Sequence, residues 1–166
     1  MVDNMVNFPN FRQKLNAQIK KLHKDVKTPT YGSDGAMAFD IYPDLLGADP
    51  FKNNILPNQT KNIPTGLFFE IPEGYGLFVY SRSGQGFNNH VTLINSTGLI
   101  DSDYRGQLMV MLRNDHPTET YFYDETKAIA QGVILPIPRV NFNVVDRLSN
   151  TARGNKGFGS TDRNKK

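Results

Sequence analysis

Short hydrophobic runs separated by proline and glycine fill the chain from residue 19 to about residue 148. These turn-forming residues recur at intervals of about 8–12 residues, which is typical of β-sandwiches and β-barrels. A Pro-Glu-Gly turn at 72–74 predicts that the runs on either side of it pair as a hairpin. We therefore predict an all-β domain, in which the clearest strands cover residues 67–71, 75–80, 108–112 and 128–137.

Two segments of different composition flank this domain. Residues 1–18 are polar with scattered apolar positions, and we interpret them as an N-terminal extension. Residues 149–166 are rich in glycine and serine, which predicts a flexible arm. From position 151 onward the arm carries five basic residues against one acid, Asp162, and this charge suits an anionic ligand.

Composition narrows the possible functions. The 166 residues are 38% hydrophobic and 21% charged, a balance typical of globular proteins. No apolar run is long enough for a membrane helix, and the first 20 residues lack the apolar stretch of a secretory signal, so we expect a cytoplasmic protein that contacts no membrane. The absence of cysteine excludes a thiol nucleophile and cysteine-ligated metals. A net charge of +3 is too small to indicate a nucleic-acid partner.

The segment Tyr80–Gln85 directly follows an apolar run and contains Arg82, Ser83 and Gly84. A guanidinium fork, a hydroxyl and the exposed backbone of glycine together suit phosphate oxygens. The alternative is an ordinary Ser/Gly turn with a solvated arginine.

The segment Asn95–Gly106 is a predicted loop between two apolar strands. Asp101 follows an apolar pair, so we expect its carboxylate to be half-buried and able to deprotonate a water molecule. The amide of Asn95 offers the donor and the acceptor that the edge of a pyrimidine requires. The alternative is an acidic turn that caps two strands.

In the arm, Phe158 stands between glycines, with Arg153 before it and Ser160 and Thr161 after it. The aromatic ring could stack on a base while the cation and the hydroxyls hold phosphates. The alternative is a disordered C-terminus.

Two polar residues interrupt apolar runs, Asp40 at 36–41 and Gln131 at 128–134. A carboxylate in such a place must be solvated, paired or close to a cation, and Mg²⁺ is its natural partner where phosphates bind. The glutamine amide needs partners that a ligand or the backbone could supply.

Taken together and in this order, these segments resemble the five signature motifs of the homotrimeric dUTP pyrophosphatases, the dUTPases. The resemblance covers about residues 19–161 and departs from the family pattern at Ala128 and Gly132. Its motifs are Ala38–Ile41, Ser81–Gly84, Gly98–Gly106, Ile129–Gln131 and Arg153–Thr161.

The resemblance implies a distorted jelly roll or β-barrel, a homotrimer that exchanges its C-terminal arms, and active sites shared between subunits. It implies hydrolysis of dUTP to dUMP and pyrophosphate with Mg²⁺ as cofactor. Asp101 would activate the attacking water, and Asp40 would hold the metal through water. The residues implied to bind substrate are Arg82, Ser83, Gly84, Asn95, Gly98, Tyr104, Gln131, Arg153, Phe158, Gly159, Ser160 and Thr161.

Three alternatives remain. A dCTP deaminase would share this fold, but it would need a glutamate where this chain has Met111, and a thioether cannot carry protons. A regulatory binding module could dock a protein partner through residues 1–18 or an insert at 45–58. Nucleic-acid binding by the basic arm is the weakest option, because few basic residues lie elsewhere.

Overall fold

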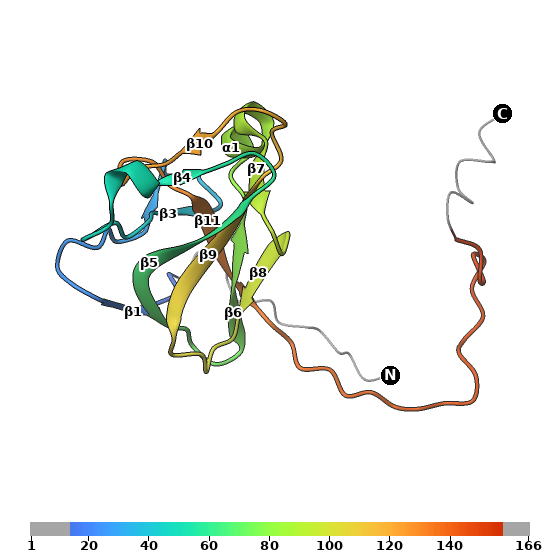
Figure 1. The fold of residues 1–166 in the computed structure, drawn as a ribbon. Helices are drawn as coiled ribbons and strands as arrows, with labels where there is room; N and C mark the ends of the chain where they lie inside the picture. The colour runs from blue at the N-terminus through green and yellow to red at the C-terminus, as the bar shows by residue number, and fades with distance from the viewer. Residues whose placement is uncertain (1–13, 158–166) are drawn as a thin grey trace.

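The computed structural model describes residues 14–157, and almost all of their regular secondary structure is β-strand (Figure 1). One short α-helix, α1 (Ser83–Asn89), and one 3-10 helix, η1 (Pro50–Lys52), interrupt the strands. The predicted all-β fold is therefore confirmed. The strands are β1 (Gln18–Lys21), β2 (Thr30–Tyr31), β3 (Phe39–Ile41), β4 (Asn54–Ile55), β5 (Thr60–Glu70), β6 (Tyr75–Tyr80), β7 (Val91–Leu93), β8 (Thr97–Ile100), β9 (Gln107–Asn114), β10 (Tyr121–Phe122) and β11 (Ala130–Pro136).

Two antiparallel sheets enclose the core. One sheet has the strand order β1-β5-β9-β7, and the other has the order β2-β3-β11-β6-β8. A small third sheet pairs β10 with β4. Neighbouring strands in each sheet are mostly distant in sequence, as expected for a jelly-roll-like sandwich rather than a series of hairpins.

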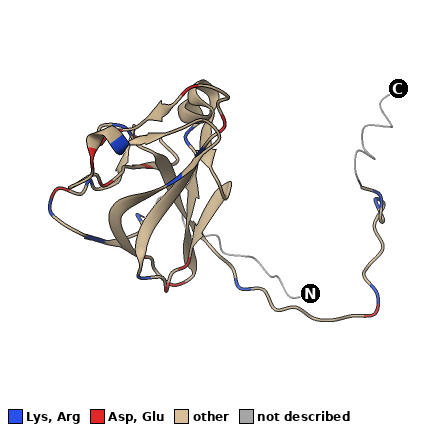
Figure 2. Cartoon of the chain, in the orientation of Figure 1, with Lys and Arg blue, Asp and Glu red and all other residues tan. Residues whose placement is uncertain are grey.

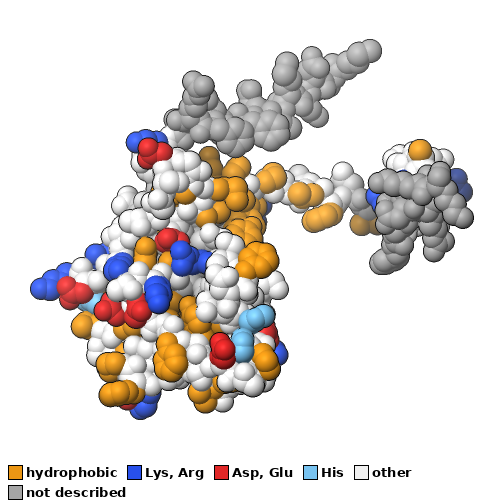
Figure 3. Space-filling model, turned by 90° about the horizontal axis from the view of Figure 1, so that it is seen from above, with side chains coloured by type: hydrophobic (Ala, Val, Ile, Leu, Met, Phe, Trp, Pro, Cys, Tyr) orange, Lys and Arg blue, Asp and Glu red, His pale blue; other side chains and the backbone are white. Residues whose placement is uncertain are grey.

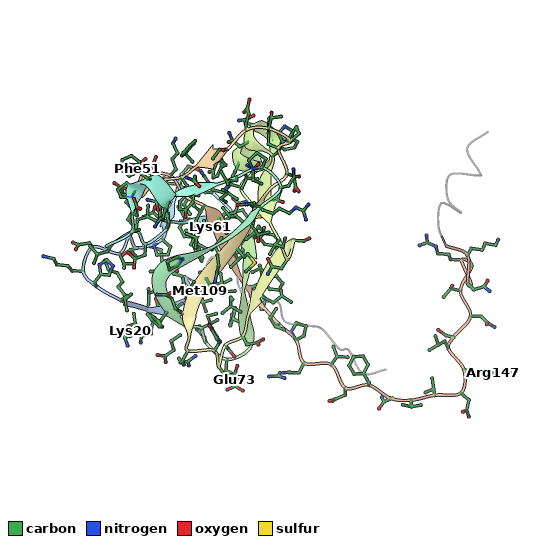
Figure 4. All side chains as sticks on the ribbon, viewed as in Figure 1. Lys20, Phe51, Lys61, Glu73, Met109 and Arg147 are labelled. Atoms are coloured by element: carbon green, nitrogen blue, oxygen red, sulfur yellow. The ribbon has the colours of Figure 1, made fainter. Side chains whose placement is uncertain are left out.

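Strand β9 shows how the sequence builds the core. Its even positions Leu108, Val110 and Leu112 are buried, whereas Met109 and Met111 on the other face are exposed (Figure 4). This period of two follows from the pleat of a strand. Burial of each aliphatic side chain contributes about 1.5–3 kcal/mol, so the inward face stabilises the sandwich, and the methionines are left on an outer face.

The predicted hairpin at 72–74 is wrong. The strands on either side of the turn, β5 and β6, belong to different sheets, so the turn carries the chain across the sandwich. The turn itself forms, with the backbone N–H of Tyr75 donating to the carbonyl of Pro72 at 3.1 Å. A Pro-Glu-Gly segment predicts a turn equally well in a hairpin and in a connection between two sheets. Only the tertiary packing of the flanking strands distinguishes the two cases.

Gly66 allows a close approach at the irregular middle of β5, where the register against β9 shifts. Its φ of +68° is in the left-handed region, and a Cβ here would lie 2.5 Å from Val26 and 2.8 Å from the Asp44 carboxylate. The Gly66 carbonyl accepts a hydrogen bond from the backbone N–H of Leu22 at 2.8 Å. Glycine is therefore needed here for the segment after β1 to pack against β5.

Beyond β11 the chain leaves the sheets, and every described residue from 138 to 157 is exposed (Figure 1). Figure 2 shows charges of both signs over the sandwich and several basic positions along this segment. Figure 3 shows hydrophobic side chains where the segment leaves the sandwich and again along its length. Within residues 14–157, no helix is long and apolar enough to span a membrane.

Candidate functional site

A cavity of about 470 Å³ lies where β3, α1 and the start of β11 meet. Lys127, Tyr121 and Glu119 line it as well. Strand pairing explains the arrangement, because Gln131 on β11 lies opposite both Asp40 on β3 and Tyr80 at the end of β6. The cavity brings together the predicted site residues Asp40, Arg82, Ser83, Gly84 and Gln131.

An ion pair crosses this cavity. The Nε of Arg82 lies 3.2 Å from Oδ1 of Asp40, and the Arg82 Nη1 donates to the carbonyl of Ala128 at 3.1 Å. Asp40 therefore has the cation that its place in an apolar strand requires. Because the side chains of Arg82 and Asp40 are 38% and 25% exposed, a ligand can still reach both groups.

Gln131 is satisfied by the backbone, one of the two possibilities that the sequence left open. Its Nε2 donates to the carbonyl of Ser81 at 2.9 Å. The Oγ of Ser81 in turn accepts from the backbone N–H of Leu93 at 2.8 Å. These two bonds tie the end of β6 to β11 and β7 and so fix the direction in which Arg82 leaves the strand.

The Ser/Gly turn that was the alternative for this segment does not form, because the residues after Arg82 are a helix, α1. The two glycines in this segment lower its helix propensity, which is why the sequence pattern hides the helix. The helix ends at His90, whose φ of 55° is left-handed and whose N–H donates to the carbonyls of Gln85 and Gly86. Tertiary packing holds the helix in place, since α1 contacts β7, and its residue Gln85 is buried and lines the cavity.

A second cavity of about 400 Å³ lies between the turn after β7 and the outer face of β9. Asn95 and Gly98 of the predicted site line it, together with Met111. None of the described residues that line it is acidic, and within residues 14–157 it shares no residue with the first cavity. The predicted base-binding residues Asn95 and Gly98 and the predicted phosphate-binding residues therefore line two separate cavities of one chain.

Asp101 follows β8 and is exposed, so the prediction of a half-buried carboxylate is wrong. The reason is that Leu99, one of the two apolar residues before it, is itself 67% exposed on a strand at the edge of its sheet. The Asp101 carbonyl accepts from the N–H of Tyr104 at 3.2 Å, and the Tyr104 hydroxyl donates to the carbonyl of Gln107. This turn presents Asp101 and Tyr104 to the outside of the single chain.

The arm contributes one described site residue, Arg153, which is exposed in a turn closed by the N–H of Gly154 and the carbonyl of Thr151. The other predicted arm residues, Phe158, Gly159, Ser160 and Thr161, lie outside the described residues.

Tyr121 and Gln85 also line the first cavity, although the sequence assigned neither of them a role. Burial raises the pKa of the Tyr121 phenol above its ordinary value of 10.0, against the opposing effect of the Arg82 charge. The phenol therefore stays a neutral O–H group beside the arginine. The isolated polar position of Gln85 in a Gly-rich segment gave no periodic signal that would have identified it.

Comparison with known proteins places this arrangement in a family. The dUTPase family model matches residues 24–162. The chain is 39% identical to the deoxyuridine 5'-triphosphate nucleotidohydrolase of Nautilia profundicola, over 89% of this chain and 99% of that protein. It is 41% identical to the protein of the same name from Bdellovibrio bacteriovorus, over 91% and 99%. The chain belongs to the dUTPase family.

The dUTPase fold is also seen in solved structures. The Staphylococcus bacteriophage 80alpha dUTPase with dUpNHpp superposes with a TM-score of 0.74 at 28% identity, and the match covers 87% of this chain and 97% of that chain. The two sheets and their crossing connections thus agree with a dUTPase-like jelly roll, as the resemblance implied.

Proposed function

We propose that this dUTPase family member hydrolyses dUTP to dUMP and pyrophosphate. The observation that carries the proposal is the cavity in which Asp40, Arg82, Ser83, Gly84 and Gln131 meet. Charged and hydrogen-bonding groups of this kind bind a polyphosphate chain. The relatives named deoxyuridine 5'-triphosphate nucleotidohydrolase support the nucleotide assignment.

The complete active site is proposed to need three copies of the chain. The separation of the phosphate cavity from the cavity at Asn95 supports this. The segment after β11 supports it as well, because Val140, Phe142 and Val144 alternate with asparagines and are 64%, 89% and 100% exposed. This alternation is that of a strand with one apolar face, and pairing with a second copy would bury it. We therefore propose a homotrimer with exchanged C-terminal arms.

In the proposed mechanism Asp101 acts as general base. Its carboxylate takes a proton from a water molecule while the water oxygen forms a bond to the α-phosphorus. The bond from that phosphorus to the oxygen bridging to the β-phosphate breaks, and pyrophosphate leaves with the bond's electron pair. Positioned proton transfer of this kind contributes about 10²–10⁴-fold to a rate. The exposed carboxylate of the single chain becomes enclosed only when the copies and the nucleotide assemble around it.

The remaining predicted residues position the nucleotide. Arg82, Ser83, Gly84 and Gln131 are proposed to hold phosphate oxygens, which fixes the α-phosphorus for attack in line with the leaving group. Asn95 and Gly98 are proposed to read uracil, with Tyr104 beneath the deoxyribose. Arg153, Ser160 and Thr161 are proposed to close over the phosphates, while Phe158 and Gly159 cover the base.

The residues of the cavity fit a hydrated Mg²⁺. Among residues 14–157 no cluster of three acidic or histidine side chains could hold a metal alone, and Asp40 is a partly exposed carboxylate beside Arg82. Magnesium typically keeps several waters and binds one or two carboxylates together with substrate phosphates. We propose that Asp40 binds the ion through water. When bound, the ion would neutralise charge on the triphosphate.

A panel of nucleotides tests the proposal. Pyrophosphate release is measured from dUTP, dCTP, dTTP and UTP, each with Mg²⁺ and with a chelator. We expect release from dUTP alone, stimulated by Mg²⁺. Equal rates with all four nucleotides would contradict the roles given to Asn95 and Tyr104. Ammonia release from dCTP would favour deamination, against which Met111 in the second cavity argues.

A regulatory role through a protein partner is a second candidate. It is favoured by Phe51 of η1, which is 90% exposed at the tip of the 45–58 insert (Figure 4). The phage 80alpha relative is described as a dUTPase that controls transfer of virulence genes. Binding partners that are captured by the full chain and lost with Phe51→Ser would support this role. The cytoplasmic location stays a prediction.

A further inference from the structure

Lys127 lines the phosphate cavity beside the ion pair of Arg82 and Asp40. It ends the turn that precedes β11, where its backbone N–H donates to the carbonyl of Asp124 at 3.4 Å. The next residue, Ala128, is buried and provides the carbonyl to which Arg82 donates. Lys127 is therefore joined directly to the residue that holds the Arg82 guanidinium, and both cations border one cavity.

The other donors of this cavity are partly used within the chain. The guanidinium of Arg82 is 3.2 Å from the Asp40 carboxylate and also donates to a backbone carbonyl. The Gln131 amide nitrogen donates to the Ser81 carbonyl. Arg82 and Lys127 are balanced on the described wall by the carboxylates of Asp40 and Glu119. Binding of a polyphosphate therefore requires a cation in this cavity that can exchange its present carboxylate partner for a phosphate.

Lys127 meets this requirement. Its Nζ lies 4.0 Å from Oδ2 of Asp124, and its side chain is 68% exposed. Asp124 has closer partners, because it accepts from both the hydroxyl and the backbone N–H of Thr126. These bonds are the main cause of the lowered pKa of Asp124, and the Lys127 charge is a smaller one. Exposed ion pairs are weak, so the ammonium can exchange Asp124 for a phosphate.

We propose that Lys127 is a substrate-binding residue whose ammonium binds phosphate oxygens of the nucleotide, an inference that rests on the proposed function. The ammonium supplies charge and hydrogen bonds and takes no part in proton transfer. Its loss therefore raises KM and the Kd of a triphosphate analogue, and leaves kcat close to the wild-type value. A guanidinium at this position keeps the charge, so Lys127→Arg retains most of the affinity.

Lys52 provides a matched control. It is also an exposed lysine three residues after an aspartate, with its Nζ 3.5 Å from Asp49, but it is absent from the described wall of the cavity. The full-length wild type, Lys127→Ala, Lys127→Arg and Lys52→Ala are compared in the same buffer. The measurements are the Kd of dUpNHpp by calorimetry, steady-state kinetics with dUTP, and the melting temperature.

We expect Lys127→Ala to weaken dUpNHpp binding about tenfold, the size typical of one charge-assisted hydrogen bond at an accessible site. Lys52→Ala should bind within about twofold of wild type, a bound set by the small effects of surface substitutions. If both alanine variants bind alike while the wild type hydrolyses dUTP, this inference is overturned and the proposed function stands. If the wild type neither binds dUpNHpp nor hydrolyses dUTP, both are overturned. A fall in kcat without a change in Kd also contradicts a binding role.

Discussion

The ring of Phe39 occupies the space in which a side chain at Gly132 would begin. The two residues are direct partners in the pairing of β3 with β11, and a Cβ on Gly132 would lie 2.5 Å from the Phe39 ring. Phe39 is buried and stacks on Phe69, with the ring centroids 6.4 Å apart. The glycine that departs from the family pattern is therefore explained by the size of the residue opposite it.

This relationship predicts that Gly132→Ala destabilises the protein by about 1–3 kcal/mol, the usual cost of overpacking a core. Phe39→Leu in the same chain should restore part of the loss, because the shorter side chain vacates the space. Urea denaturation of the two single variants and the double variant measures the coupling. Gly35→Ala is the control, since a Cβ there meets nothing within 4 Å. Additive effects of the two changes would contradict the steric explanation.

Gln85 carries a buried amide whose nitrogen and oxygen have no hydrogen-bond partner among the described residues. An unpaired buried polar group costs about 1–3 kcal/mol, so Gln85→Leu should raise the free energy of unfolding by an amount in this range. Gln85→Glu should lower it, because the same site would then bury a charge. Chemical denaturation of both variants provides the measurement. A less stable leucine variant would mean that the amide is paired to water in solution.

The raised pKa of Tyr123 predicts that the protein loses stability in alkali. Burial raises the pKa of its phenol above 10.0, so the folded chain holds this proton more tightly than the unfolded chain does. The stabilising contribution is complete below the unfolded pKa and is lost as the pH rises through the higher folded pKa. Tyr123→Phe should therefore lose less stability than wild type between pH 8 and pH 11, two values chosen on either side of about 10. Tyr31→Phe, at an exposed tyrosine, is the control. Parallel curves for wild type and Tyr123→Phe would contradict this prediction.

Local patterns predicted parts of four strands, β5, β6, β9 and β11, because each has its own signal of apolar residues and turns. The predicted loop at 95–106 is wrong in part, since it contains β8. Strand β6 begins and ends at the predicted residues, and β9 extends the predicted strand by one residue at its N-terminal end and by two at its C-terminal end. The crossing at 72–74 could not be predicted, because the partner of a strand is decided by contacts between residues far apart in sequence.

In the candidate site, too, the sequence predicted local features and missed those that depend on the tertiary fold. Asp40 was expected to be solvated, paired or close to a cation because a carboxylate in an apolar strand allows few alternatives, and the structure shows it paired with Arg82. The exposure of Asp101 was missed because an apolar pair before a residue does not reveal that the strand lies at a sheet edge. Lys127 and Gln85 stand next to the motifs at 129–131 and 81–84, but neither was assigned a role from the sequence, because only the fold shows that they line the cavity.

Asp101 gives the sharpest test of the proposed chemistry. Replacing it by asparagine keeps the shape and hydrogen-bonding capacity of the side chain but removes the group that accepts the proton from water. We expect Asp101→Asn to lower kcat by about 10²–10⁴-fold, while dUpNHpp binds nearly as tightly as it does to wild type. In the single chain Asp101 is exposed, and a surface substitution should change the free energy of unfolding of that chain by no more than about 0.5 kcal/mol. Asp103→Asn, two residues further along the same exposed turn, serves as the control. If the two variants turn over dUTP at equal rates, Asp101 is not the general base.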